Sequence, residues 1–299
     1  MDSVRRNRIK ILLYCLTGLS AAAITVSTIG LFSNIQERGQ GKAFYASLAP
    51  AHADRAAAQP SEKLQTQVRG LSWEKNMTAN SPDIENKPNL GLNIDGEILI
   101  EETRTPLSQW QPYVDFARLR EDLPDITAWI ECEGIGIDFP VVQGKDNTYY
   151  LSRLPNGERN NMGSVFMDYR NSEGFSDKNT MIYGHALTSG QMFAVLKKYQ
   201  EQAFYAEHPV LRLYTPDGDY EIVLIAGYIV DSSKKEDVPP LEFKDETAFE
   251  QYISAVKKRS TFISGVNADA DDKLVSLATC AYTATVYRYV LVGKLVECT

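Results

Sequence analysis

Metal-ligating side chains are scarce in this chain of 299 residues. It contains three histidines and four cysteines, and it has no Cys-x-x-Cys pair. No histidine is spaced with a cysteine as a ligand pair, which disfavours a zinc site. Residues 267–272 mimic the opening of a Ca²⁺-binding loop, but Asp272 and Ala278 stand where such a loop needs glycine and glutamate. The residues therefore predict no metal site.

Charged side chains are absent from residues 11–32, a run of 22 residues. As a helix this run is about 33 Å long, which matches the hydrocarbon core of a bilayer. Four of the residues in 1–10 are cations, so we expect this end in the cytoplasm and the remaining chain outside the membrane. A cleaved signal peptide is the alternative. The nearest small-x-small site, at 51–53, lies about twenty residues beyond the run, which favours an uncleaved anchor.

Basic character is also lacking beyond the N-terminus. The net charge is −8, and residues 1–10 carry +3, which leaves −11 for the rest of the chain. An acidic chain of this kind disfavours nucleic-acid binding through a basic surface. Of the cysteines outside the apolar run, Cys132 and Cys298 either pair in an oxidising compartment or stay free, and the sequence leaves both alternatives open.

Residues 33–105 show no sustained helical or strand period and contain Pro60, Pro82 and Pro88. We interpret them as an extracytoplasmic stalk, with short helices possible within 43–68, that connects the anchor to a globular domain at 106–299. That domain opens with a short helix predicted around 110–117. Two further helices are predicted from apolar stripes at Met192–Tyr199 and Phe249–Val256, the second with a capping box at Thr247 and Glu250.

Eight strand-like runs with turn signals between them follow the first helix, and they predict a closed barrel or a sandwich. The runs are 127–133, 138–142, 163–167, 179–183, 210–215, 220–230, 273–279 and 287–296.

Three candidate catalytic residues lie at the ends of these runs. Cys280 ends an apolar strand, Arg288 opens the next, and His185 follows Gly184 where another apolar run is expected to give way to a loop. A cysteine in this position is usually part of the core, and an arginine usually forms a surface ion pair. Together, however, the three side chains supply a nucleophile, an acid or base and an oxyanion donor.

These residues and their surroundings resemble the active-site signature of the sortases. The similarity extends through Ile137–Gly144, Asp146–Leu151 and Gly163–Asp168, which resemble class B sortases in particular. It covers about 190 residues from Pro106 onward. Ser276 stands where many members have threonine, a change that keeps the hydroxyl group.

The resemblance implies a mainly β fold, an eight-stranded sortase-type barrel with an N-terminal helix and a long inserted helix. It implies Cys280 as the nucleophile, His185 as the catalytic histidine and Arg288 as the arginine that holds the motif and stabilises the oxyanion. The substrate-binding residues expected from it are Asn147, Tyr183, Thr279 and Ser276. The implied reaction is transpeptidation, which needs neither a metal nor an organic cofactor.

The implied substrate is a surface protein with a C-terminal sorting motif, cleaved after threonine and transferred to an amine of a cell-wall precursor. A motif of the Asn-Pro-x-Thr type is favoured over Leu-Pro-x-Thr-Gly. We expect the insert helix 247–259 to wall the cleft and the loop Asp231–Lys244 to contact the peptide. A pilin-polymerising sortase with a lysine acceptor is one alternative.

Two interpretations lie outside this family. Phosphatases with a cysteine nucleophile place five residues between cysteine and arginine, whereas seven separate Cys280 from Arg288 here. A non-catalytic, membrane-tethered barrel that binds wall components would tolerate the loss of Cys280. The sequence therefore favours a membrane-anchored cysteine transpeptidase.

Overall fold

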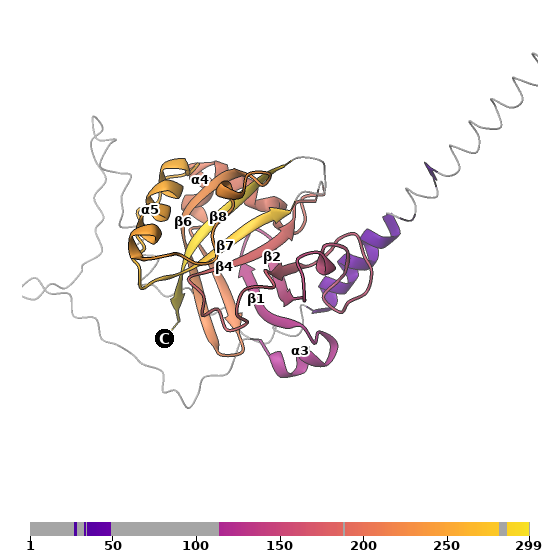
Figure 1. Ribbon diagram of the computed structural model, residues 1–299. Helices are drawn as coiled ribbons and strands as arrows, with labels where there is room; N and C mark the ends of the chain where they lie inside the picture. Colours follow the sequence, from indigo (N-terminus) through magenta and orange to yellow (C-terminus); the bar gives the residue numbers. More distant parts are fainter. Residues whose placement is uncertain are drawn as a thin grey trace, which may run out of the picture.

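The computed structural model describes residues 27–28, 33, 35–48, 114–187, 189–280 and 286–298. Within these ranges eight strands close into a barrel in the order β1-β2-β3-β4-β7-β8-β6-β5 (Figure 1). The predicted β-barrel is thereby confirmed. The strands are β1 (Ile126–Cys132), β2 (Ile137–Gln143), β3 (Val165–Met167), β4 (Asn179–His185), β5 (Val210–Thr215), β6 (Gly218–Asp231), β7 (Lys273–Cys280) and β8 (Tyr287–Glu297).

The pairing of β4 with β7 is parallel and runs from Asn179 opposite Leu274 to His185 opposite Cys280. This register corrects the expectation that the strand stops at Tyr183 and that His185 stands in a loop. Gly184 remains in the strand because its missing side chain admits the Phe193 ring, to which an added Cβ would approach within 2.6 Å. The histidine is therefore held by strand hydrogen bonds at the very end of β4.

Apolar side chains fill two compartments on opposite faces of the sheet. The barrel interior contains residues such as Ile130, Leu213 and Leu277, all fully buried. The second compartment lies between the outer face of β4, β6, β7 and β8 and the helix α5 (Glu246–Arg259), which contributes Phe249, Ile253 and Val256. The stripe predicted for this helix faces the barrel, and burial of such side chains contributes most of the stability of a fold of this kind.

The other helices described between residues 114 and 298 are short. They are α3 (Phe116–Asp122), α4 (Gln202–Glu207) and the 3₁₀ helices η4 (Tyr149–Ser152), η5 (Phe193–Gln200) and η6 (Lys235–Asp237). The insert predicted at 192–199 is η5, whose apolar side chains enter the barrel core. The capping box expected at Thr247 is wrong, because the helix begins at Glu246 and Asp245, two residues before Thr247, caps it by accepting a hydrogen bond from the Ala248 N–H.

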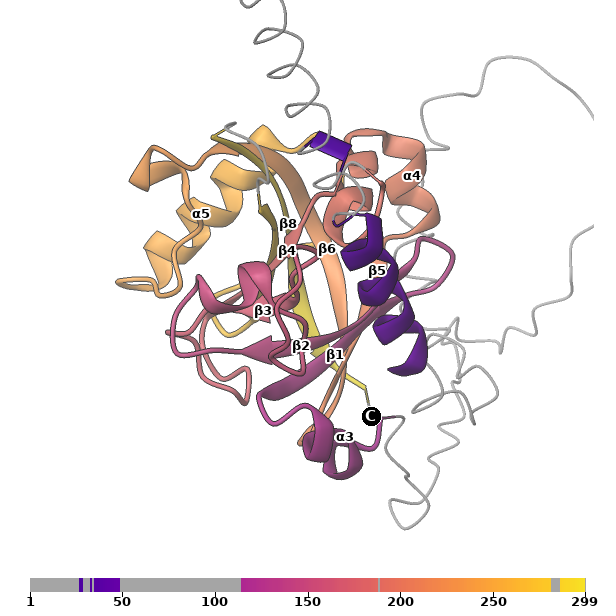
Figure 2. The same cartoon turned by 90° about the vertical axis from the view of Figure 1, so that its right-hand side faces the viewer.

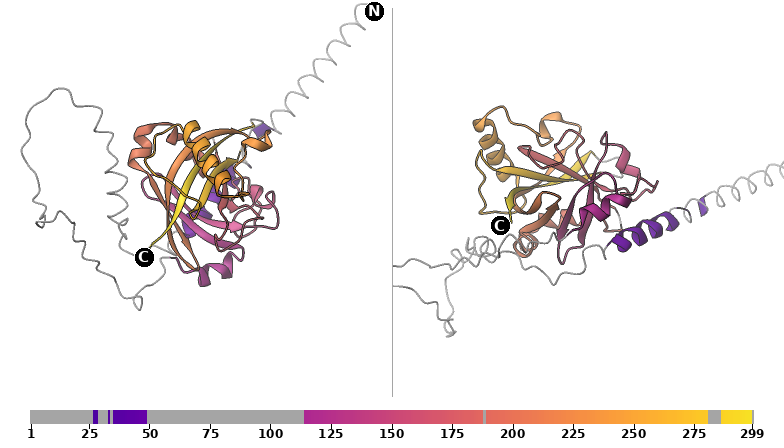
Figure 3. Two further views of the ribbon diagram at one scale, coloured as in Figure 1. Left: turned by 60° about the vertical axis from the view of Figure 1, so that its left-hand side comes forward. Right: turned by 90° about the horizontal axis from the view of Figure 1, so that it is seen from below.

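A further helical segment precedes α3 in the sequence and contacts the barrel from outside. Helix 35–48 lies along the barrel wall near β1 and β5, drawn in indigo (Figure 2; Figure 3). Leu48 and Phe44 pack with Trp129 and Tyr214 in a separate apolar cluster. Of the predicted stalk, 33–105, the structure describes residue 33 and this helix.

A membrane-spanning helix is not found among the residues that the structure describes, since none of their helices is both long and apolar enough to cross a bilayer. The predicted anchor, residues 11–32, lies outside those residues apart from 27 and 28. The residues 110–113 of the predicted first helix also lie outside them, and α3 begins at Phe116.

Candidate active site

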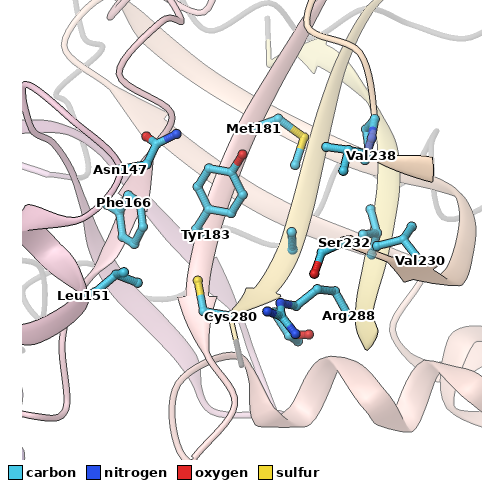
Figure 4. Close-up of a pocket in the computed structure, with 14 residues that line it drawn as sticks. Asn147, Leu151, Phe166, Met181, Tyr183, Val230, Ser232, Val238, Cys280 and Arg288 are labelled. Carbon is cyan, nitrogen blue, oxygen red and sulfur yellow. The ribbon is translucent and has the colours of Figure 1, made fainter. Parts of the chain in front are cut away.

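A pocket of about 330 Å³ opens on the outer face of the barrel, within the range typical of ligand sites (Figure 4). Its floor is formed by side chains of β4, β6, β7 and β8, and its sides by the segment around η4 and by the loop between β6 and α5. The lining residues are Asn147, Leu151, Phe166, Met181, Tyr183, Val230, Ser232, Val238, Pro239, Ala278, Thr279, Cys280, Arg288 and Val290.

Cys280 and Arg288 face this pocket from neighbouring antiparallel strands. The β7–β8 pairing ends at Ala278 opposite Val290, and both of these residues line the pocket. Cys280 lies two residues beyond Ala278, and Arg288 lies two residues before Val290, so both project to the same face. Figure 4 shows the thiol and the guanidinium group at one end of the pocket. The separation of Cys280 and Arg288 by seven residues is thus consistent with the strand register.

His185 completes this row on the other side of Cys280. The two residues are partners at the last position of the parallel β4–β7 ladder, and partner residues project to the same side of a sheet. The pair before them on this face, Tyr183 and Ala278, lines the pocket. The structure therefore brings His185, Cys280 and Arg288 together in one row across three adjacent strands.

The imidazole of His185 is buried, with 4% of the residue exposed. Its Nε2 lies 2.6 Å from the carbonyl oxygen of Leu151, and a carbonyl can only accept, so Nε2 carries the proton and Nδ1 is the basic nitrogen of the neutral ring. Burial lowers the pKa of His185, and the Leu151 hydrogen bond opposes that change. At neutral pH the ring is therefore largely uncharged.

The Cys280 thiol is also uncharged in this structure. Burial raises the pKa of Cys280 to about 12, although the nearby positive charge of Arg288 acts to lower it. These two pKa shifts favour a neutral thiol and a neutral imidazole over a preformed thiolate and imidazolium pair. Nucleophilic attack by Sγ requires that the thiol proton leave as the bond forms, and a neutral imidazole is a suitable acceptor.

Two of the expected substrate-binding residues, Thr279 and Ser276, form hydrogen bonds within the barrel through their hydroxyl groups. The Oγ1 of Thr279 accepts a hydrogen bond from the backbone N–H of Tyr289 at 2.9 Å, where β7 and β8 diverge, although Thr279 still lines the pocket. Ser276 is fully buried and its Oγ donates to Oδ1 of Asn179 at 2.8 Å. The structure does not bring Ser276 to the pocket.

Asn147 and Tyr183 both line the pocket and share one buried partner, Asp168. The Asn147 amide and the Tyr183 hydroxyl each donate to Oδ2 of Asp168 at 2.9 Å. Arg170 donates to both carboxylate oxygens, at 2.9 Å and 2.8 Å. Burial by itself raises the pKa of Asp168, but the hydrogen bonds from Arg170, Asn147 and Tyr183 outweigh it and hold the pKa below its ordinary value. The ionised carboxylate fixes this wall of the pocket.

Sequence reasoning did not identify Asp168 or the Leu151 carbonyl as parts of the site. Asp168 belongs to one of the family motifs, but its role depends on contacts with three other segments. A backbone carbonyl has no signature in a sequence. The loop Asp231–Lys244 was expected near the peptide, and its Ser232, Val238 and Pro239 do line the pocket.

Comparison with known families identifies the protein class. The sequence model of the sortase domain matches residues 130–296. The chain belongs to the sortase family. Sortase B of Listeria monocytogenes is 38% identical over 175 residues, which cover 58% of this chain and 70% of that protein. Sortase B of Staphylococcus aureus is 31% identical over 205 residues, which cover 67% and 83% of the two chains.

Solved structures agree with this assignment to class B. The Staphylococcus aureus sortase B–substrate complex superposes with a TM-score of 0.59 at 31% identity, covering 62% of this chain and 85% of that one. Sortase B from Listeria monocytogenes superposes with a TM-score of 0.54 at 35% identity, covering 60% and 99%. This sortase is therefore a cysteine transpeptidase of class B, an enzyme that acts on sorting motifs.

The other cysteines of this sortase that the structure describes are separate from the pocket. Cys132 is buried and Cys298 is exposed, and both are free thiols. Among the residues that the structure describes, no group of three or more histidine, cysteine, aspartate or glutamate side chains is arranged to hold a metal ion.

The raised pKa of Cys280 predicts how its alkylation depends on pH. Because only the thiolate reacts, the rate of Cys280 modification by iodoacetamide should rise about tenfold per pH unit between about pH 7 and pH 10 without reaching a plateau. Arg288→Gln should slow the reaction several-fold at a given pH because it removes a nearby cation, whereas Arg288→Lys should keep most of the rate. Peptide mass spectrometry of the modified chain measures this. A plateau near neutral pH would contradict the neutral resting thiol.

Proposed function

We propose that this sortase is a membrane-anchored transpeptidase that cleaves a C-terminal sorting motif after its threonine and transfers the acyl group to an amine of a cell-wall precursor. The observation that supports the catalytic assignment is the single row formed by His185, Cys280 and Arg288 across β4, β7 and β8. Cys280 and Arg288 line one end of a pocket that is otherwise largely apolar, and His185 is the strand partner of Cys280.

In the first half of the reaction, Sγ of Cys280 attacks the threonine carbonyl carbon while His185 accepts the thiol proton. Arg288 stabilises the negative charge that develops on the carbonyl oxygen. The C–N bond of the scissile peptide then breaks, and the imidazolium donates its proton to the leaving amine. The product of this half is a thioester between Cys280 and the threonine carbonyl.

In the second half, an incoming amine attacks the thioester carbonyl and gives up a proton to His185. The C–S bond breaks, a new amide bond forms, and the proton returns to the Cys280 sulfur. Both the thiol and the imidazole regain the neutral forms that burial favours. The cycle consumes one peptide bond and forms another, so it requires no redox partner.

Substitution of the three residues tests the catalytic assignment. Cys280→Ala should lower kcat/KM for transpeptidation by about a thousandfold or more because no thioester forms, and His185→Ala should be nearly as damaging. Arg288→Ala should lower it by about a hundredfold, the loss expected of one oxyanion donor. Product masses are read after incubation with a motif peptide and an amine. Cys298→Ala and Cys132→Ala are the matched controls and should stay active; near-normal turnover by a folded Cys280→Ala variant would refute the assignment.

The proposed motif is of the Asn-Pro-x-Thr type. Support comes from the class B relationship and from the loop 231–244, whose Ser232, Val238 and Pro239 line the pocket. Two peptides that differ only in Asn or Leu at the first motif residue should differ in kcat/KM by about ten- to a hundredfold in favour of Asn, which corresponds to about 1–3 kcal/mol. A preference for Leu would refute the substrate class and leave the thiol mechanism intact.

The proposed acceptor is an amine at the N-terminus of a wall peptide, and a sortase B has been solved in complex with triglycine. Triglycine and a lysine-containing peptide, offered together, distinguish wall anchoring from pilin polymerisation by the mass of the product.

The proposed location is the cell membrane, with residues 1–10 in the cytoplasm, 11–32 as the anchor and the catalytic domain outside. Support comes from the uncharged run and the cations before it. In intact cells an external protease should digest the domain while a cytosolic marker survives. Recovery of a mature chain that begins after Ala53, or a domain that resists protease when known surface proteins are digested, would contradict this topology.

A further inference from the structure

Helix 35–48 contacts the segment before β3 through one stripe of its surface, formed by Glu37, Gly41 and Tyr45. These residues are four apart and therefore lie on one face of the helix. All three contact the same short segment of the barrel, residues 160–163, which leads into β3. Gly41 is buried, whereas its neighbours Gln40 and Lys42 are exposed.

The contacts along this stripe are close and specific. The Asn160 amide donates to the backbone carbonyl of Glu37 at 2.8 Å, and the Asn161 amide donates to the Glu37 carboxylate at 2.7 Å. A Cβ on Gly41 would lie 3.0 Å from Sδ of Met162, so the helix lies close to the barrel segment and a larger residue at position 41 would require the Met162 side chain to move. The Tyr45 hydroxyl donates to the carbonyl oxygen of Gly163 at 2.9 Å.

Gly163 is in turn in direct contact with the site of His185. Its φ is +65°, a conformation that favours glycine. A Cβ there would lie 2.6 Å from Cδ2 of His185 and 2.8 Å from the Leu151 carbonyl oxygen that accepts the Nε2 hydrogen bond. The next residue connects the segment 160–163 with η4, because the Ser164 N–H donates to the Tyr150 carbonyl at 3.0 Å. The backbone of Gly163 therefore forms one wall of the imidazole site.

We propose that helix 35–48 is a positioning element for His185 and that Tyr45 is its principal positioning residue, acting through the carbonyl of Gly163. The inference rests on the proposed role of His185 in catalysis. The Tyr45 hydroxyl holds the Gly163 peptide in the orientation that keeps the imidazole against Leu151, so the orientation and tautomer of the ring depend on a helix that precedes the barrel in the chain.

Tyr45 is suited to an isolated test. Its ring packs edge-on against Phe139, with ring centroids 5.4 Å apart, and Phe44 and Leu48 hold the helix through separate apolar contacts. Burial raises the pKa of Tyr45 far above the working range, so the hydroxyl is always a donor. Tyr45→Phe therefore removes the hydroxyl, with its hydrogen bonds to the Gly163 carbonyl and to the Ser164 side chain, and keeps the ring. Ser47→Ala is the matched control, because its hydroxyl donates to the Phe44 carbonyl within the exposed face of the same helix.

The experiment compares both variants with the wild type in the full-length chain. Hydrogen–deuterium exchange at the imidazole C2 position, read by mass spectrometry over a pH series, gives a rate and a pKa for each histidine, and His208 is the internal reference. In Tyr45→Phe we expect faster exchange and a higher pKa at His185, an unchanged His208, and a kcat reduced about three- to tenfold with an unchanged KM. Ser47→Ala should match the wild type in every measurement.

An exchange rate at His185 that is the same in Tyr45→Phe and Ser47→Ala would overturn the inference. A Tyr45→Phe variant that changes KM and leaves kcat unaltered would overturn it as well. The exchange measurement at His185 does not depend on catalytic turnover. A wild-type chain that fails to transfer peptides would refute the proposed function, while the exchange comparison would still decide whether helix 35–48 positions the histidine.

Discussion

The parallel pairing of β4 with β7 is the constraint on which the rest of this site depends. It places His185 opposite Cys280 although almost a hundred residues separate them in the sequence. The antiparallel β7–β8 ladder then adds Arg288 to the same row. Because strand register is fixed by the buried faces on both sides of the sheet, a shift by one residue would turn each of these side chains to the other face. The barrel core therefore determines the geometry of the chemistry.

Side chains on the two faces of this sheet pack in different surroundings, and this difference explains the position of the pocket. Inward side chains fill the barrel, whereas outward side chains of the same strands are shared between α5 and the pocket floor. Val230, Ala278 and Val290 pack in the compartment beneath α5 and also line the pocket. The opposite wall is polar and is organised by the buried carboxylate of Asp168. A peptide bound here would lie between an apolar floor and a fixed hydrogen-bonded wall.

Most of the barrel could be predicted from the sequence, because each strand is a short apolar run between turn residues. The errors have local physical causes. The strand expected at 163–167 begins two residues later, at Val165 of β3, because Gly163 has a positive φ. Strand β4 continues through Gly184 because Phe193 packs against it.

The cysteine, histidine and arginine were identifiable from their positions at strand ends and from family motifs. The family resemblance implies Ser276 as a site residue, but its hydroxyl donates to Asn179 in the core, a contact that the sequence does not reveal. Contacts made by backbone atoms, such as the Leu151 carbonyl and the Gly163 peptide, could not be predicted, since they depend on the folded chain and not on residue type.

Burial of the nucleophile has a consequence for its chemical durability. Peroxides and other oxidants attack the thiolate much faster than the thiol, and the first product, a sulfenic acid, can proceed to forms that no reductant restores. With a pKa of about 12, Cys280 is almost entirely protonated near neutral pH. We therefore expect the thiol to react slowly with adventitious oxidants between turnovers, and to become a strong nucleophile when a substrate carbonyl is in place and the imidazole can take its proton. The desolvation that raises the pKa of the nucleophile is thus also expected to protect it from oxidation.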